Sequence, residues 1–189
     1  GAPFLAYQWD LLLLEATLLA ALMQWHRALG VWALRLLAMR FLFLSGWVKL
    51  ASGDASWWTR SALEYHFETQ PLPGPLSWWA HQLPDGLLAA ATGTMLALEL
   101  LLPLALIAPR RLRSLAGLVY IAFQLAIVAT GNYNFFNLLA MVLALSLLDD
   151  RALGIDATPG SRRPGRSLRR IGVAGLVLIS AFGLLQTGR

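Results

Sequence analysis

Lys49 is the residue with the clearest capacity for acid–base chemistry, because it is the only lysine in the chain, beside 14 arginines. A buried lysine can lose its proton, whereas an arginine does not, and the neutral amine can then act as a base. With Asp10 as its acidic neighbour, Lys49 is therefore the one catalytic candidate. The alternative is a lysine whose ammonium group reaches the membrane surface along its alkyl chain.

A second polar group lies in EYHFE, where Glu64, His66 and Glu68 alternate, and His81 follows further along the chain. Two histidines and a carboxylate are enough to hold zinc. In a helix, residues 64 and 66 point about 200° apart, and only a strand would bring all three to one face. We expect no metal and no cofactor here. We expect these side chains, with Gln70, to fix the surrounding loop through hydrogen bonds.

Asparagines are clustered in TGNYNFFN, residues 130–137. Gly131 and Asn132 tolerate a positive φ, and Asn134 can cap a following helix by accepting backbone N–H bonds. Asn137 would then lie one turn inside that helix. Three asparagines beside a tyrosine exceed the need of one cap, so we predict a hydrogen-bonded contact between this cluster and the ETQPLP bend.

Thiol chemistry is excluded because the chain has no cysteine. The sequence also has no nucleotide-binding loop, no serine triad motif and no pair of carboxylates at catalytic spacing. These absences favour a protein without a catalytic centre, and leave Lys49 with Asp10 as the enzymatic alternative.

The composition is that of a membrane protein. Hydrophobic residues make up 58% of the chain and charged residues 13%, against roughly a quarter charged in ordinary soluble domains. The basic residues, which give a net charge of +5, occur in short clusters between apolar runs. This pattern is typical of cytoplasmic loops of membrane proteins and not of a nucleic-acid-binding face. The expected partner is the lipid bilayer.

Apolar segments of about the length that crosses a bilayer recur along the chain. We predict an all-α, polytopic transmembrane bundle of five to six spans, with a Trp-rich interfacial loop between spans 2 and 3. Residues 1–150 would form the bundle, residues 151–170 an Arg-rich cytoplasmic linker, and residues 171–189 a last transmembrane helix. The six segments are residues 9–25, 31–50, 87–108, 112–130, 135–148 and 171–186.

Arginine placement predicts the orientation, because cytoplasmic loops accumulate Lys and Arg. Arginines at 110–113 and in the 151–170 linker would lie on the cytoplasmic side. Residues 51–86 and 131–134 would then lie together on the opposite, non-cytoplasmic side.

The 51–86 loop carries two Trp-Trp pairs, at residues 57–58 and 78–79, on either side of a proline-rich bend. Three prolines in five residues exclude a helix at the bend. We predict one helix, a rigid turn and a second helix lying on the membrane surface. Interfacial anchoring by the tryptophans is one interpretation, and a groove for a partner's apolar surface is the other.

Several charges fall inside the predicted spans, where each unpaired charge costs roughly 2.5–3.5 kcal/mol. They should therefore pair, either as a structural network or as a functional site. Matching depths along the helices predicts Lys49 near Asp10 and Arg40 between two glutamates. A second arginine lies deeper. The residues of this predicted intramembrane network are Glu15, Arg35, Arg40 and Glu99.

Five strings carry a resemblance to the lipase maturation factor family over about residues 4–150. They are AYQWDLLLLEA, FLSGWVKLASGD, LEYHFETQPLPGPLSWWAHQLP, ELLLPLALIAPRRLR and TGNYNFFNLL. The resemblance implies a membrane protein that helps secreted proteins, lipases among them, to mature. Its location would be the endoplasmic reticulum membrane in a eukaryote, or the inner membrane in a bacterium. Members of this family are larger and have a soluble region after the spans.

A fainter similarity joins SGWVKL and the following Trp-rich loop to the membrane domain of vitamin K-dependent carboxylases. That resemblance implies a lysine base at Lys49 and an enzyme acting on a lipid-soluble substrate. The leading hypothesis is a non-catalytic maturation factor that contacts a secreted, lipase-like client.

Overall fold

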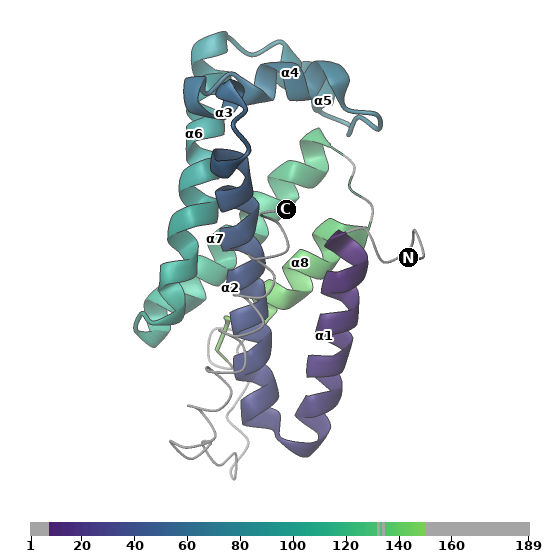
Figure 1. Ribbon diagram of the computed structural model, residues 1–189, viewed down its shortest axis with the longest axis vertical. Coiled ribbons are helices and arrows are strands. Elements are labelled where there is room, and N and C mark those ends of the chain that lie inside the picture. The colour runs from purple at the N-terminus through teal and green to yellow at the C-terminus, as the bar shows by residue number, and fades with distance from the viewer. Residues whose placement is uncertain (1–7, 132, 134, 150–189) are drawn as a thin grey trace.

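A computed structural model describes residues 8–131, 133 and 135–149, and this part of the chain is helical without strands (Figure 1). The described elements, in chain order, are α1 (Gln8–Trp25), α2 (Arg27–Ala51), α3 (Ala55–Thr59), α4 (Ala62–Thr69), α5 (Ser77–His81), α6 (Asp85–Leu101), the 3₁₀ helix η2 (Leu102–Leu106), α7 (Arg110–Thr130) and α8 (Phe135–Leu145).

The long helices form a bundle around α2, which packs against α1, α6, η2 and α8. Within the described residues, three helical segments are long and apolar enough to cross a membrane. They are Arg27–Ala51, Asp85–Leu106 and Arg110–Thr130, and α8 is a shorter apolar helix. The prediction of an all-α membrane bundle is confirmed. Helix α1 matches the first predicted segment but is not among these three, and the predicted linker and last helix lie outside the described residues.

The third predicted span, residues 87–108, is not one continuous α-helix. Helix α6 ends at Leu101 and the chain continues as η2, which has Pro103 near its start. Proline has no N–H and its ring clashes with the preceding turn, so the chain tightens into a 3₁₀ helix at this point.

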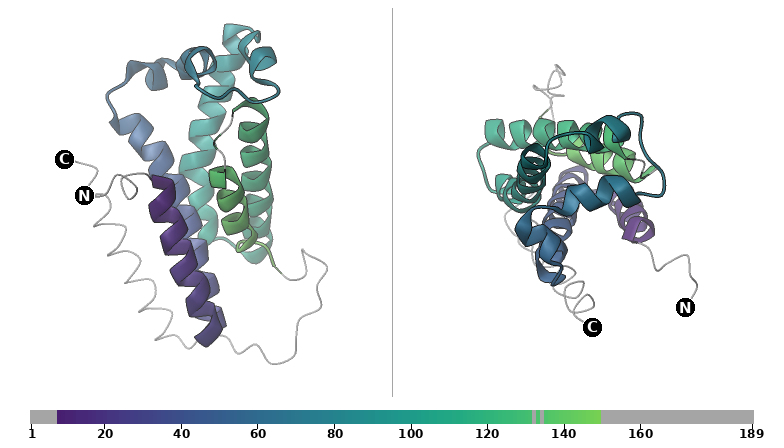
Figure 2. Two further views of the ribbon diagram at one scale, coloured as in Figure 1. Left: turned by 90° about the vertical axis from the view of Figure 1, so that its right-hand side faces the viewer. Right: turned by 90° about the horizontal axis from the view of Figure 1, so that it is seen from above.

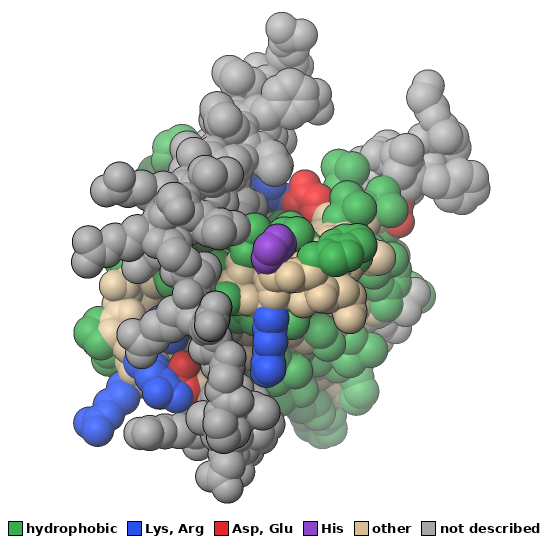
Figure 3. Space-filling view, turned by 90° about the horizontal axis from the view of Figure 1, so that it is seen from below, with side chains coloured by type: hydrophobic (Ala, Val, Ile, Leu, Met, Phe, Trp, Pro, Cys, Tyr) green, Lys and Arg blue, Asp and Glu red, His purple; other side chains and the backbone are tan. Residues whose placement is uncertain are grey.

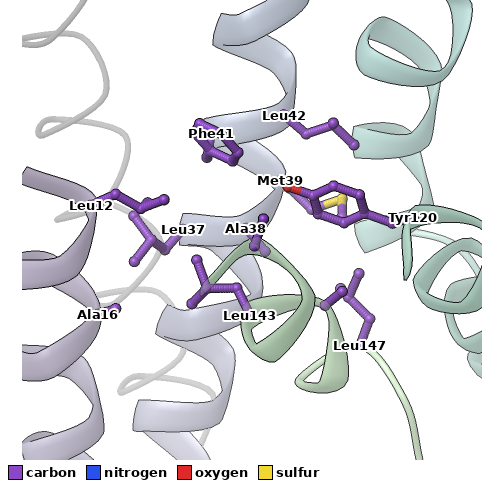
Figure 4. Packing of buried hydrophobic residues seen from close by; sticks show 12 residues of the cluster. Leu12, Ala16, Leu37, Ala38, Met39, Phe41, Leu42, Tyr120, Leu143 and Leu147 are labelled. Atoms are coloured by element: carbon purple, nitrogen blue, oxygen red, sulfur yellow. The ribbon is translucent and has the colours of Figure 1, made fainter. Parts of the chain in front are cut away.

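The core is apolar and draws on four helices (Figure 4). Leu12 of α1 lies beside Leu37 of α2, whereas Leu42 of α2 lies on the side of Tyr120 of α7, and Leu143 of α8 completes the cluster. The Tyr120 ring is fully buried. Most of the remaining large apolar side chains point outward, as expected where lipid is the surrounding solvent.

At the end of the bundle opposite residues 51–86, ion pairs join two parts of the chain. Asp149 forms ion pairs with Arg110 and with Arg113, the latter at 3.3 Å, and accepts a hydrogen bond from Ser114 Oγ at 3.3 Å. These contacts tie the start of α7 to the chain just after α8. Figure 3 shows basic side chains beside an acidic one on this face.

Candidate functional site

Residues 51–86, with Gly131 and Tyr133, form the end of the bundle that we call the loop end. Its three short helices, α3 to α5, lie across the ends of the long helices instead of continuing them (Figures 1 and 2). One helix was predicted before the proline-rich bend, and that prediction is wrong. The chain breaks between α3 and α4 at Arg60, whose φ is 65°, and Asp54 caps α3 by accepting the Ser56 N–H at 2.9 Å.

The proline-rich bend caps the end of α7. The last carbonyl groups of a helix have no partner within the helix. Here the Leu76 N–H donates to the Ala129 carbonyl at 2.8 Å, and Ser77 Oγ donates to the Thr130 carbonyl at 2.7 Å. Gln70 Nε2 adds a bond to the same Thr130 carbonyl at 3.2 Å. Residues more than 50 positions earlier in the chain thus satisfy the end of this helix.

Two glycines allow the backbones to come this close. A Cβ on Gly74 would lie 2.8 Å from the Gly131 nitrogen and 2.9 Å from the Ala129 oxygen. A real Cβ atom does not approach backbone atoms this closely, so any other residue at position 74 would push the bend away from α7. The glycine of PLPGP and the glycine of TGNY therefore belong to one packed contact.

His66 and Tyr133 make a further link across the loop end. The Tyr133 hydroxyl lies 3.1 Å from His66 Nε2, and the two rings stack with centroids 6.2 Å apart and planes 8° apart. Burial, and then the positive charge of nearby Lys49, lowers the pKa of His66 below its ordinary value. Burial raises the pKa of the Tyr133 hydroxyl. Both effects favour a neutral imidazole bonded to a neutral phenol.

The structure joins TGNYNFFN to the bend through the bond from Gln70 Nε2 to the Thr130 carbonyl, and not through the one asparagine of the cluster that lies in the described residues. Asn137 does not take part, because it is buried in α8 and donates through Nδ2 to Gln124 Oε1 of α7 at 2.8 Å. Asn137 is the third residue of α8, where it faces α7. Asn132 and Asn134 lie outside the described residues.

The ion pairs partly follow the depth-matching prediction. Arg40 of α2 pairs with Glu15 of α1, as predicted from their heights along the helix hairpin. Arg35 lies deeper and donates through Nε to the Ser146 carbonyl.

Lys49 pairs with Glu99 of α6, so its predicted pairing with Asp10 is wrong, and so is the second predicted partner of Arg40. The reason is the close packing of α2 against α6 at Gly46. A Cβ on Gly46 would lie 2.9 Å from the Glu99 Cβ. Lys49 is three residues further along α2 and on the same face, so its ammonium group reaches the carboxylate.

The Lys49–Glu99 pair lies just beneath the loop end. Only 6% of the Glu99 side chain and 22% of the Lys49 side chain are exposed. The Lys49 Nζ also lies 5.6 Å from the centre of the Trp57 ring, within the range of a cation–π contact. The ammonium group of Lys49 is therefore paired with a carboxylate on one side and covered by an indole ring on the other.

The EYHFE residues lie on α4, so Glu64, His66 and Glu68 do not share one face. Instead, Glu68 lies 4.0 Å from His81 Nε2 of α5, across the bend. Within the described ranges, no three His, Cys, Asp or Glu side chains are grouped as metal ligands would be.

Sequence reasoning missed Ser77 and Gly74 as parts of the loop end. It placed Glu99 in the intramembrane network but missed its pairing with Lys49.

Comparison with known proteins gives a consistent result. A family model described as lipase maturation factor transmembrane domain matches residues 1–155. The chain is 42% identical to lipase maturation factor 2 of Gallus gallus over 181 residues, which cover 88% of this chain and 25% of that protein. It is 38% identical to lipase maturation factor 2 of Homo sapiens over 215 aligned residues, covering 100% of this chain and 30% of that protein. It is 34% identical to lipase maturation factor 1 of Homo sapiens over 133 residues, which cover 69% of this chain and 23% of that protein.

The chain therefore spans about a quarter to a third of the length of the lipase maturation factor 2 relatives that it matches. No solved structure matches it.

Proposed function

Since the chain belongs to the lipase maturation factor family, we propose that it is an integral membrane maturation factor that assists secreted proteins, lipases among them. The observation that carries this proposal is the match of the family model to the whole described bundle. The loop end supports it, because the bend of residues 70–77 and the end of α7 join there through hydrogen bonds and close backbone packing into one surface.

The loop end is, in this proposal, the working surface. It contacts the client, or it supports a soluble region. The relatives are three to four times as long as the part that this chain matches, so they could contain such a region. The side chains that shape it are Glu64, His66, Glu68 and Gln70, with Tyr133 from the other motif. The contacts of His66 with Tyr133, of Glu68 with His81 and of Gln70 with the Thr130 carbonyl hold α4 and α5 in place, so these side chains act by holding the surface and not by reacting.

The membrane arrangement is also part of the proposal. Helices α1 and α8 would join the three long apolar segments as further spans, which gives five spans in the described residues and a sixth beyond them. The loop end would then face the non-cytoplasmic side. The membrane would be that of the endoplasmic reticulum in a eukaryote, or the inner membrane in a bacterium.

The test is the secretion profile of cells that lack the full-length protein. We expect at least one secreted lipase to fall in activity while its messenger RNA is unchanged, and the native gene to restore it. An unchanged set of secreted enzymes would contradict the proposal.

The alternative is a membrane enzyme, similar to the carboxylases, with Lys49 as its base and a lipid-soluble substrate. The position of Lys49 beneath the loop end favours it, although Glu99 takes the place that Asp10 was expected to have.

The variant Lys49→Arg separates the two functions. It retains a positive charge for Glu99 but removes a titratable amine. Full maturation activity in this variant would exclude the enzymatic function. A folded but inactive variant would favour it.

A further inference from the structure

The helix α5 and its neighbouring residues carry large apolar side chains that are strongly exposed, which we call the α5 apolar surface. Residues 69–84 contain no Asp, Glu, Lys or Arg. Contiguous apolar surface of this kind marks a site of interaction. The residues of the α5 apolar surface are Leu72, Leu76, Trp78, Trp79 and Leu83, each between 43% and 64% exposed.

The bonds between α5 and α7 set the depth of this surface. Helix α7 has 21 residues, so it rises about 31 Å, close to the roughly 30 Å thickness of the hydrocarbon layer. The Leu76 N–H and Ser77 Oγ bond to the carbonyls of its final two residues, Ala129 and Thr130. Helix α5 therefore lies where the hydrocarbon ends and the headgroups begin. Seen from above, it lies over the end of α7, toward the edge of the molecule (Figure 2).

The chemistry of the surface suits that level. A tryptophan combines an apolar ring system with one polar N–H, and such rings collect at the boundary between headgroups and acyl chains. Trp78 and Trp79 are 62% and 64% exposed and pack edge to face, with centroids 4.7 Å apart. Ser77 and Ala80 are the buried side of the same helix. The ring pair consequently points away from the bundle.

The charged side chains of the loop end lie outside the α5 apolar surface. The carboxylates of the loop end are on α3's cap, on α4 and at the start of α6, at Asp54, Glu64, Glu68 and Asp85. None lies between α4 and α6. A surface that binds a soluble partner is usually rimmed by polar and charged groups, whereas residues 69–84 carry no Asp, Glu, Lys or Arg.

We propose that the α5 apolar surface is inserted among the headgroups of the bilayer that the bundle crosses, and that it anchors the bend of residues 70–77 on the end of α7. This requires only that the bundle spans a membrane. It does not depend on a role in maturation.

The absence of cysteine allows a direct measurement of depth. Single-cysteine variants Trp78→Cys and Trp79→Cys of the whole chain would carry a nitroxide label in phosphatidylcholine vesicles. Glu68→Cys, at a side chain 61% exposed, is the reference for a charged position. Leu125→Cys, at a residue 53% exposed on α7, is the reference for the hydrocarbon. The measured quantity is the ratio of collision rates with oxygen and with a water-soluble nickel complex.

We expect labels at residues 78 and 79 to give ratios between those of the two references. Ratios equal to that at residue 68 would mean that the surface faces water and is free for a soluble partner, which would overturn the proposal. Shielding from both reagents would mean a protein contact and would also overturn it.

A second measurement uses the native chain. Phosphatidylcholine with a photoreactive diazirine next to the headgroup should label residues 72–83 after illumination, as read by mass spectrometry. Labelling of α6 and α7 without labelling of residues 72–83 would contradict insertion, whatever the variants show.

Discussion

Replacing Gly74 with alanine tests whether the two signature motifs form one structural unit. The added Cβ would lie 2.8 Å from the Gly131 nitrogen and 2.9 Å from the Ala129 oxygen. Both are backbone atoms at the end of α7, so neither can move aside as a flexible side chain would. The bend must therefore shift away from the helix.

The expected loss follows from the bonds that join the bend to α7. They number three, two to the Thr130 carbonyl and one to the Ala129 carbonyl. A hydrogen bond contributes about 0.5–1.5 kcal/mol net. Loss of all three would destabilise the closed bend by about 3 kcal/mol, which corresponds to roughly a 100-fold larger population of the open form.

Hydrogen–deuterium exchange in detergent or nanodiscs measures this population locally. Amides of residues 76 and 77 should exchange up to about 100-fold faster in Gly74→Ala, while those of α2 stay unchanged. Gly86→Ala is the matched control, because a Cβ there meets nothing within 4 Å and alanine favours a helix by up to about 1 kcal/mol. Equal exchange in Gly74→Ala and the native chain, or an equal increase in both variants, would refute the reasoning.

Three further predictions concern charge. Reversing Glu15 or Arg40 alone should lower the yield of folded protein, because it places like charges together in the bundle, and the double reversal should restore it; no rescue, measured by size-exclusion chromatography, would exclude the pair. Glu99→Ala should destabilise the bundle by about 3 kcal/mol, as removal of one partner of a buried pair does, and lower its thermal midpoint; Glu99→Ala with Lys49→Met should recover part of the loss. His66 has a lowered folded pKa, so its contribution to stability is complete above its unfolded pKa of about 6.5 and is lost as the pH falls through the folded value. Exchange near residue 133 should rise on acidification, and His66→Gln should remove that dependence.

The long helices of the bundle could be predicted from the sequence, because the length of an apolar segment can be read from consecutive residues. The second predicted segment, residues 31–50, lies within α2, and the fourth, residues 112–130, lies within α7. The Glu15–Arg40 pair was also predictable, since the two helices are joined by a short turn and run antiparallel. Heights along such a hairpin follow from counting residues.

The partner of Lys49 could not be predicted in the same way. Depth gives a residue's height but not which neighbouring helix stands beside it, and counting residues placed Glu99 beside Arg40 and Asp10 beside Lys49. The break at Arg60 was equally hidden, because a positive φ at a residue other than glycine has no sequence signal. The contact at Gly74 depends on α7, whose end is more than 50 residues away in the chain.

The sequence separation of the Lys49–Glu99 pair has a consequence for how the protein is made. Fifty residues separate the two partners, against 25 for Arg40 and Glu15. At a synthesis rate of roughly 5–20 residues per second, α2 enters the bilayer about 3–10 s before Glu99 is made. During that interval Lys49 must keep its ammonium group in the headgroup layer, which its place near the end of α2 allows. The arrival of α6 then supplies Glu99, the carboxylate partner of Lys49.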